Sequence, residues 1–199
     1  MKQITFRQYR NIDLIILTVL MVFFETITTF ASSKWFAGQP VALSISLAII
    51  CVTMMRWNGY AAVLAVAGGF AFCAASGATP GQYVIYCAGN VFSLAALGII
   101  RIFGKEQIRA DVLKLLLFGL TAYLGMVAGR GVISLLFGGT YKIFVVYAAT
   151  DIMSLVFAEV ILILLRKSDG MIEDQKSYLL RLDREKKKQD TTAEPGGGN

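Results

Sequence analysis

Residues 142–165 read KIFVVYAATDIMSLVFAEVILILL, an apolar run interrupted by two acids, Asp151 and Glu159. The hydrocarbon core of a bilayer takes about 20 mostly apolar residues as one helix. Five further stretches have the same character, namely 12–31, 41–56, 59–78, 82–101 and 112–137. The sequence therefore predicts an all-α integral membrane protein with six transmembrane helices.

The composition supports this class. The chain is 56% hydrophobic and 16% charged over 199 residues, whereas a soluble globular chain carries about 25% charged residues to cover its surface. It contains no histidine, which removes the Ser-His-Asp arrangement and the commonest metal ligand. Cys51, Cys73 and Cys87 lie in apolar stretches without CxxC spacing. We therefore expect buried thiols, no cofactor, no metal and no water-soluble enzyme.

Basic residues are distributed very unevenly around the predicted spans. Sixteen of the 19 Lys and Arg fall on the side that holds both termini, while Lys34 and Lys142 fall on the other and Arg130 lies within a span. Because basic residues accumulate in cytoplasmic segments, both termini are predicted to be cytoplasmic and the protein to lie in the cell membrane. The expected organisation is a cytoplasmic N-terminus over 1–11, a transmembrane domain over 12–166, a cytoplasmic amphipathic and basic segment over 167–190, and a disordered tail over 191–199.

Four polar residues are expected at a similar depth within different spans: Glu25, Asn90, Arg130 and Asp151. At about 1.5 Å per residue they lie roughly 9–13 Å below the outer boundary, whereas Glu159 falls in the inner half. Unpaired charges cost about 2.5–3.5 kcal/mol each at mid-bilayer. We interpret the layer as a pocket open to the outside. In the alternative interpretation, Arg130 pairs with Asp151 or Glu25 and merely locks the bundle.

Aromatic and amide side chains surround the predicted layer at its outer rim, and Trp35 lies in a predicted loop that could cover it. The candidate substrate-binding residues are Glu25, Trp35, Gln82, Tyr86, Asn90, Arg130, Tyr147 and Asp151. If Arg130 pairs with one acid, the other acid is left to meet donors on a small heteroaromatic ligand with an amine or cationic group. The opposite case, in which Arg130 binds a ligand carboxylate, stays open.

Small residues recur every fourth position on two predicted spans. Ala61, Ala65 and Gly69 form one row and Gly125 and Gly129 another. Such spacing allows helices to approach closely. The rows therefore predict tight helix packing.

The hairpin that runs from Pro40-Val41-Ala42-Leu43 through Arg56-Trp57-Asn58-Gly59-Tyr60-Ala61-Ala62 to Gly68-Gly69 has a recognisable pattern. An apolar helix, a short basic-Gly turn and a Gly/Ala-rich helix follow one another. Together with the span count, the orientation and the polar layer, this resembles the substrate-binding S-component of an energy-coupling factor (ECF) vitamin transporter over residues 10–166.

The resemblance implies a function and partners. An S-component captures a vitamin or related micronutrient outside the cell and delivers it with a membrane coupling subunit and two ABC ATPases; it does not hydrolyse ATP itself. No nucleic-acid partner is implied. The family often carries an Ala-x-x-x-Ala patch on its first helix for docking, which Leu14 to Phe30 lacks, so the Ala61, Ala65 and Gly69 row is the candidate docking surface.

Two other classes of function remain open from the sequence. A non-catalytic membrane scaffold subunit, such as a cell-shape protein of the MreD kind, has a similar size and span count. An intramembrane enzyme would use Glu25, Asp151 or Glu159 as acid or base, but the chain has no paired-carboxylate motif and no P-loop, HExxH or GxSxG motif.

Overall fold

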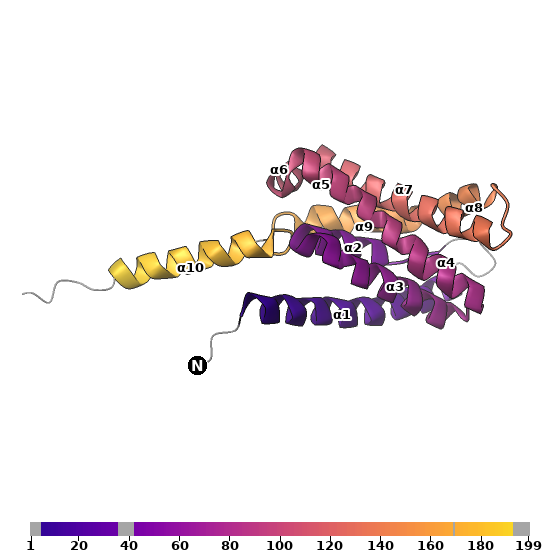
Figure 1. The fold of residues 1–199 in the computed structure, drawn as a ribbon, viewed down its shortest axis with the longest axis horizontal. Coiled ribbons are helices and arrows are strands. Elements are labelled where there is room, and N and C mark those ends of the chain that lie inside the picture. The colour runs from indigo at the N-terminus through magenta and orange to yellow at the C-terminus, as the bar shows by residue number, and fades with distance from the viewer. Residues whose placement is uncertain (1–4, 36–41, 169, 193–199) are drawn as a thin grey trace, which may run out of the picture.

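The fold is that of a computed structural model, which describes residues 5–35, 42–168 and 170–192, with side chains described up to residue 185. Within these ranges the chain is helical and contains no strand. The helices are α1 (Phe6–Trp35), α2 (Ser46–Trp57), α3 (Ala61–Ser76), α4 (Pro80–Val91), α5 (Leu97–Phe103), α6 (Lys105–Ala110), α7 (Val112–Leu136), α8 (Ile143–Thr150), α9 (Ile152–Leu165) and α10 (Gln175–Thr192), with 3-10 turns at Asn58–Tyr60 and Phe92–Ala96. The helices α1 to α9 form one elongated bundle (Figure 1).

Four helical stretches are long and apolar enough to cross a membrane: Phe6–Trp35, Ser46–Ser76, Pro80–Phe103 and Val112–Leu136. The helices α8 and α9 form a pair that is bent by 45° at its break, and counting this pair as one span gives up to five candidate spans. Large apolar side chains face outward along α1, including Ile15 at 63% exposed and Val19 at 62%. An apolar outer surface of this kind is compatible with a membrane location.

The stretch Ser46–Ser76 turns back on itself at Asn58–Tyr60. A Cβ added to Gly68, in the middle of α3, would lie 2.5 Å from Oγ of Ser46, the first residue of α2. The two helices are therefore antiparallel neighbours, as the hairpin in the sequence predicts. With 12 residues, α2 is about 18 Å long, which is shorter than the hydrocarbon core of about 30 Å. By length and composition alone the structure has four stretches that could cross a membrane, or five with the bent pair, and Ser46–Ser76 among them is a hairpin. Six crossings are part of the proposed function.

The non-helical segment before α2 and the break between α8 and α9 lie side by side in the bundle. Residues 42–45 precede α2 without helical structure, and Asp151 separates α8 from α9. The backbone N–H of Ala42 donates to the carbonyl oxygen of Thr150 at 3.0 Å. The sequence predicts spans over 41–56 and 142–165. The second helix therefore begins later than expected, and the last is broken at Asp151.

Glycine allows α4 and α7 to cross in backbone contact. A Cβ on Gly129 would lie 2.5 Å from the carbonyl oxygen of Gly89, and one on Gly125 would lie 2.3 Å from that of Phe92. The small-residue row on α7 is therefore a helix-packing surface, as its spacing predicts.

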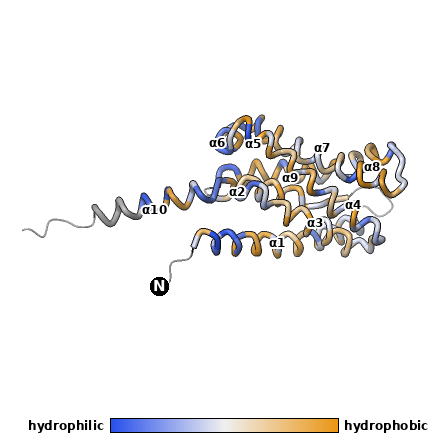
Figure 2. The backbone as a smooth tube through the Cα atoms, viewed as in Figure 1, coloured by the Kyte–Doolittle hydropathy of each residue, from blue (hydrophilic) through white to orange (hydrophobic). Residues whose placement is uncertain are grey.

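Polar side chains gather at one end of the bundle, where α6 and the Asn58–Tyr60 turn lie. We call this the α6 end. Figure 2 shows the hydrophilic residues of α1, α6 and α10 toward it. Arg56 binds Asp13 at 2.7 Å and donates from Nη1 to the carbonyl oxygen of Gly170 at 2.6 Å. These contacts attach the chain after α9 to the bundle.

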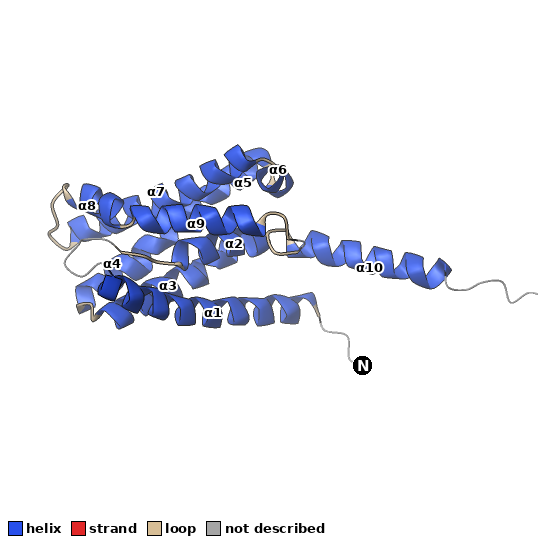
Figure 3. Cartoon of the chain, turned by 180° about the vertical axis from the view of Figure 1, so that it is seen from behind, coloured by secondary structure: helices blue, strands red, loops and turns tan. Residues whose placement is uncertain are grey.

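Beyond this attachment, α10 extends away from the bundle in both views (Figures 1 and 3). A helix was expected within 167–190, and α10 begins at Gln175. The helix continues to Thr192, so the first two residues of the predicted disordered tail are helical, and the rest lie outside the described residues.

Candidate functional site

The carboxylate of Glu25 lies at the N-terminus of α2. Its Oε2 accepts hydrogen bonds from the backbone N–H groups of Ile45 and Ser46 and from the hydroxyl of Ser44, each at 3.0 Å. The first N–H groups of a helix have no partner within it, and a negative charge is stabilised there by the helix dipole. Glu25, on α1, therefore holds the start of α2 from a neighbouring helix.

Ser154 forms hydrogen bonds with the same non-helical segment, residues 42–45, from the side opposite Glu25. Its Oγ accepts from the backbone N–H of Ser44 at 2.9 Å and donates to the carbonyl oxygen of Ala42 at 3.1 Å. Irregular backbone at membrane depth is tolerated where protein groups satisfy its donors and acceptors or where it lines a cavity. Residues 42–46 thus lie between Glu25 on α1 and the break between α8 and α9.

Arg130 is the centre of a buried polar cluster. Its Nη1 forms an ion pair with Asp151, and its Nε donates to Oδ1 of Asn90 at 2.8 Å. Asn90 in turn donates from Nδ2 to the carbonyl oxygen of Ala65 at 3.3 Å. Arg130 and Asp151 are each 4% exposed and Asn90 is 1% exposed. The cluster joins α3, α4, α7 and the break between α8 and α9.

Aromatic rings cover the guanidinium group. The Arg130 guanidinium carbon lies 4.3 Å from the centroid of the Tyr86 ring, a distance suited to a cation–π interaction. Phe72 stacks on Tyr86 at 4.8 Å between centroids, and Tyr147 meets Tyr86 edge-on at 6.0 Å. The ring of Tyr86 is therefore engaged by Arg130, Phe72 and Tyr147 at once.

Five of the eight candidate binding residues come together in this cluster: Tyr86, Asn90, Arg130, Tyr147 and Asp151. Glu25 belongs to the same region, across the segment 42–46. Of the two pairings that the sequence leaves open for Arg130, the structure contains the pair with Asp151.

Gln82 and Trp35 lie elsewhere. The side chain of Gln82 accepts from the backbone N–H of Thr79 at 2.7 Å and so caps α4. Trp35 was expected in a loop, but α1 continues to it, and its side chain is 74% exposed. The rest of the predicted loop, 36–40, lies outside the described residues.

The row of small residues on α3 is used within the chain. Ala61 and Ala65 are fully buried, and a Cβ on Gly69 would lie 2.7 Å from the backbone of Tyr86 on α4. A partner subunit would reach Ala65 and Gly69 only if α3 and α4 separated.

Two serines and one acid were not among the candidates. Ser44 and Ser154 form the hydrogen bonds of this region. Ser154 has a signal in the sequence, a hydroxyl three residues after Asp151 within an apolar run, whereas Ser44 has no acid near it in the sequence. Glu159 lies against α7, since a Cβ on Gly119 would be 2.3 Å from its Oε1, and its Oε2 is buried without a hydrogen-bond partner. It lies apart from the Arg130 cluster, as its expected depth implies.

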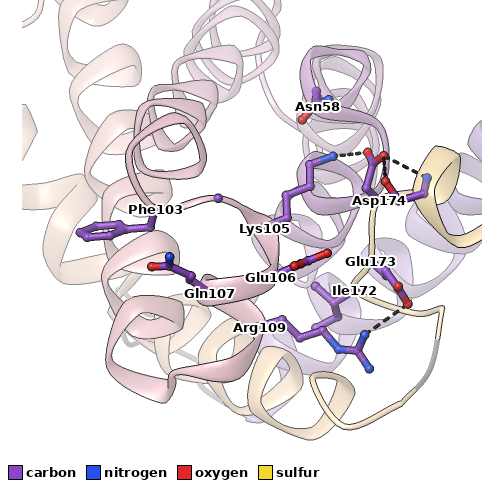
Figure 4. Close-up of a pocket in the computed structure, with 11 residues that line it drawn as sticks. Asn58, Phe103, Lys105, Glu106, Gln107, Arg109, Ile172, Glu173 and Asp174 are labelled. Atoms are coloured by element: carbon purple, nitrogen blue, oxygen red, sulfur yellow. Dashed lines mark hydrogen bonds and ion pairs between the residues drawn. The ribbon is translucent and has the colours of Figure 1, made fainter.

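A cavity of about 430 Å³ opens at the α6 end, lined by residues of α6, the Asn58 turn and the chain before and within α10. Figure 4 shows Lys105 directed at Asp174 and Arg109 at Glu173, and these ion pairs measure 2.6 and 3.2 Å. Opposite charges from α6 and the segment 173–174 thus hold this end together. The Arg130 cluster does not line this cavity.

No protein-family model, curated protein or solved structure matches the chain. The Arg130 cluster, the segment 42–45 and the break between α8 and α9 are therefore the features from which a function can be inferred.

Proposed function

We propose that this protein is a membrane-embedded solute-binding subunit for uptake, of the kind that the S-components of ECF transporters represent. In this proposal the chain crosses the cell membrane six times, with residues 42–57 as one crossing, and both termini are cytoplasmic. Its ligand is a small micronutrient, a vitamin or a heteroaromatic precursor. The ligand enters from outside the cell and binds at the level of Arg130.

The observation that carries the proposal is that the non-helical segment 42–45 and the break between α8 and α9 meet at a buried charged cluster. Residues 42–45 precede α2 and lie beside Asp151, which separates α8 from α9, with Glu25 on one side and Arg130 on the other. Discontinuous helices in transporters commonly form substrate sites near mid-membrane, because they free backbone groups for binding. Ionisable residues at this depth are costly and usually functional.

The contacts of the cluster suggest how a ligand would be accommodated. Arg130 is bound to Asp151, Asn90 and Tyr86, so an entering ligand has to replace some of these partners. Asp151 lies at the junction of α8 and α9, where a rotation of α8 would separate it from Arg130. We propose that ligand binding accompanies such a movement.

Calorimetry on the purified chain tests the site with a panel of acidic, neutral and cationic vitamins. We expect at least one to bind, and Arg130→Gln and Asp151→Asn each to weaken it by about 2–5 kcal/mol. Gln82→Ala, which alters a side chain outside the cluster, should bind as the wild type does. If both cluster variants fold and bind with unchanged affinity, the ligand site lies elsewhere.

The proposed partners are a membrane coupling subunit and two ABC ATPases, and the chain itself performs no catalysis. Affinity purification from the native host should recover these three proteins. Recovery of other partners without any ATPase would contradict an uptake role.

One observation favours a second candidate, a structural subunit such as a cell-shape scaffold. The Arg130 cluster is mutually paired and closed, as expected of groups that only lock helices together. For a scaffold, no vitamin would bind, and purification would recover cell-shape proteins.

A further inference from the structure

A second cavity opens at the α6 end, lined by residues of α6, of α10 and of the chain just after α9. Its volume is about 420 Å³, and it adjoins the cavity of Figure 4, with which it shares Arg109 and Glu173. Basic side chains outnumber acidic ones among its described lining residues, with Arg109, Arg166, Lys167 and Arg181 against Glu106 and Glu173. Four positive charges thus face two negative ones.

The acid at the centre of this cavity is shared by two arginines. Oε2 of Glu173 pairs with Nη1 of Arg109 at 3.2 Å, and Oε1 of Glu173 pairs with Nη1 of Arg181 at 3.0 Å. Arg166 donates from Nη1 to the carbonyl oxygen of Ala110 at 3.4 Å. Neither Arg166 nor Lys167 forms an ion pair with another described residue. The positive excess therefore lies where the chain leaves α9.

Exposed leucines border the same place on the side of the bundle. Leu164, two residues before Arg166, is 69% exposed, and Leu113, three residues after Ala110, is 74% exposed. They belong to α9 and α7, apolar helices that have an end here. A soluble anion gains nothing from such leucines, whereas a phospholipid carries a phosphate group and acyl chains in one molecule. The combination of basic and apolar groups favours a lipid.

We propose that this cavity binds the phosphate group of an anionic phospholipid, with Arg166 and Lys167 as its main cationic contacts. Basic pockets beside membrane helices bind anionic headgroups in this way, and the planar guanidinium group of arginine matches the oxygens of a phosphate. The acyl chains lie along Leu113 and Leu164. The site is separate from the Arg130 cluster, and the inference requires a membrane but no vitamin.

Native mass spectrometry of the purified full-length chain in neutral detergent tests the proposal. Phosphatidylglycerol is titrated against phosphatidylcholine with the same acyl chains. We expect one phosphatidylglycerol to bind at least tenfold more tightly than phosphatidylcholine. Millimolar inorganic phosphate should leave it bound, because phosphate has no acyl chains to contact the leucines.

Variants separate the cavity from the general charge of the chain. Lys167→Gln, at an exposed side chain, should weaken phosphatidylglycerol binding about fivefold, and Arg166→Gln with Lys167→Gln more than tenfold. The single variant decides the matter if the double variant does not fold. Arg7→Gln with Arg101→Gln removes the same charge at exposed residues that do not line the cavity, and it should bind as the wild type does.

Three results would overturn the proposal. Equal affinity for the two lipids, or an equal loss of binding in the two double variants, would leave no specific site. Phosphatidylglycerol binding that is unchanged in Lys167→Gln and in the double variant at Arg166 and Lys167 would place the lipid elsewhere. Displacement by inorganic phosphate would assign the cavity to a soluble anion. None of these results bears on vitamin binding, which calorimetry measures without added phosphatidylglycerol.

Discussion

Arg130 and Asp151 illustrate how a buried ion pair constrains the whole cluster. Both groups are almost completely buried, and Arg130 also contacts Asn90 and Tyr86. Because an unpaired charge in a low-dielectric interior is costly, each partner depends on the other. The pair therefore acts as one unit.

At this scale we predict strong coupling in a double-mutant cycle. Arg130→Met or Asp151→Leu alone should lower the free energy of unfolding by about 3–5 kcal/mol, while the double variant should lose much less, because no charge stays uncompensated. Thermal unfolding of the purified variants measures this. The exposed Arg101→Gln is the control and should stay within about 0.5 kcal/mol. Additive losses would show that the two side chains are not paired.

Ser154 provides a second prediction for a single residue. Ser154→Ala removes the acceptor of the Ser44 N–H and the donor to the Ala42 carbonyl oxygen. Unpaired buried groups should then cost about 1–3 kcal/mol of unfolding free energy. Ser33→Ala, an exposed serine that bonds within its own helix, should have little effect. Equal stability of the two variants would contradict the role of Ser154 at the break.

At the scale of the elements, the crossing of α4 and α7 depends on glycine. A Cβ at Gly89 would lie 2.7 Å from the backbone N and Cα of Arg130, whereas one at Gly98 on α5 would meet nothing within 4 Å. Replacing glycine by alanine should therefore destabilise the chain at Gly89 but not at Gly98.

We predict that Gly89→Ala separates α4 from α7 and costs about 1–3 kcal/mol of unfolding free energy. Because Asn90 is the next residue, this variant should also weaken any ligand binding at the cluster. Gly98→Ala should stabilise the chain by up to about 1 kcal/mol through helix propensity. Thermal unfolding distinguishes them, and a stable Gly89→Ala variant would rule out close backbone contact there.

At the scale of the molecule, the α6 end collects charged side chains, and this gives the orientation a structural test. Asn58 and Lys105 line the same cavity although they are far apart in sequence. They must therefore face the same side of the membrane, whichever side that is.

Single cysteines at Asn58 and Lys105, in a background without Cys51, Cys73 and Cys87, should resist impermeant thiol reagents in intact cells. Cysteines at Gly77 and Gly139 should react. The reason is the excess of basic residues at the α6 end. Labelling of Lys105 from outside would reverse the orientation, and different behaviour of Asn58 and Lys105 would contradict the fold.

Much of the helical arrangement was predictable from local sequence. Hydropathy located α1, α3, α7 and the hairpin turn at Asn58, because apolar length and turn residues act over short distances. Asn90, Arg130 and Asp151 were expected at one depth from their positions within the predicted spans, and the structure joins them. Trp35 was misplaced in a loop because α1 continues helical past its apolar run.

What the sequence determined by itself is the class of structure: apolar length and sparse charge require helices with an apolar exterior, whatever their order in space. The tertiary structure alone decided the partners of the buried polar groups. Glu25 could have paired with Arg130, but it caps α2, because the backbone N–H groups of Ile45 and Ser46 at the start of that helix have no helical partner and lie beside it. Such a choice depends on backbone donors, and these have no side-chain signature in the sequence.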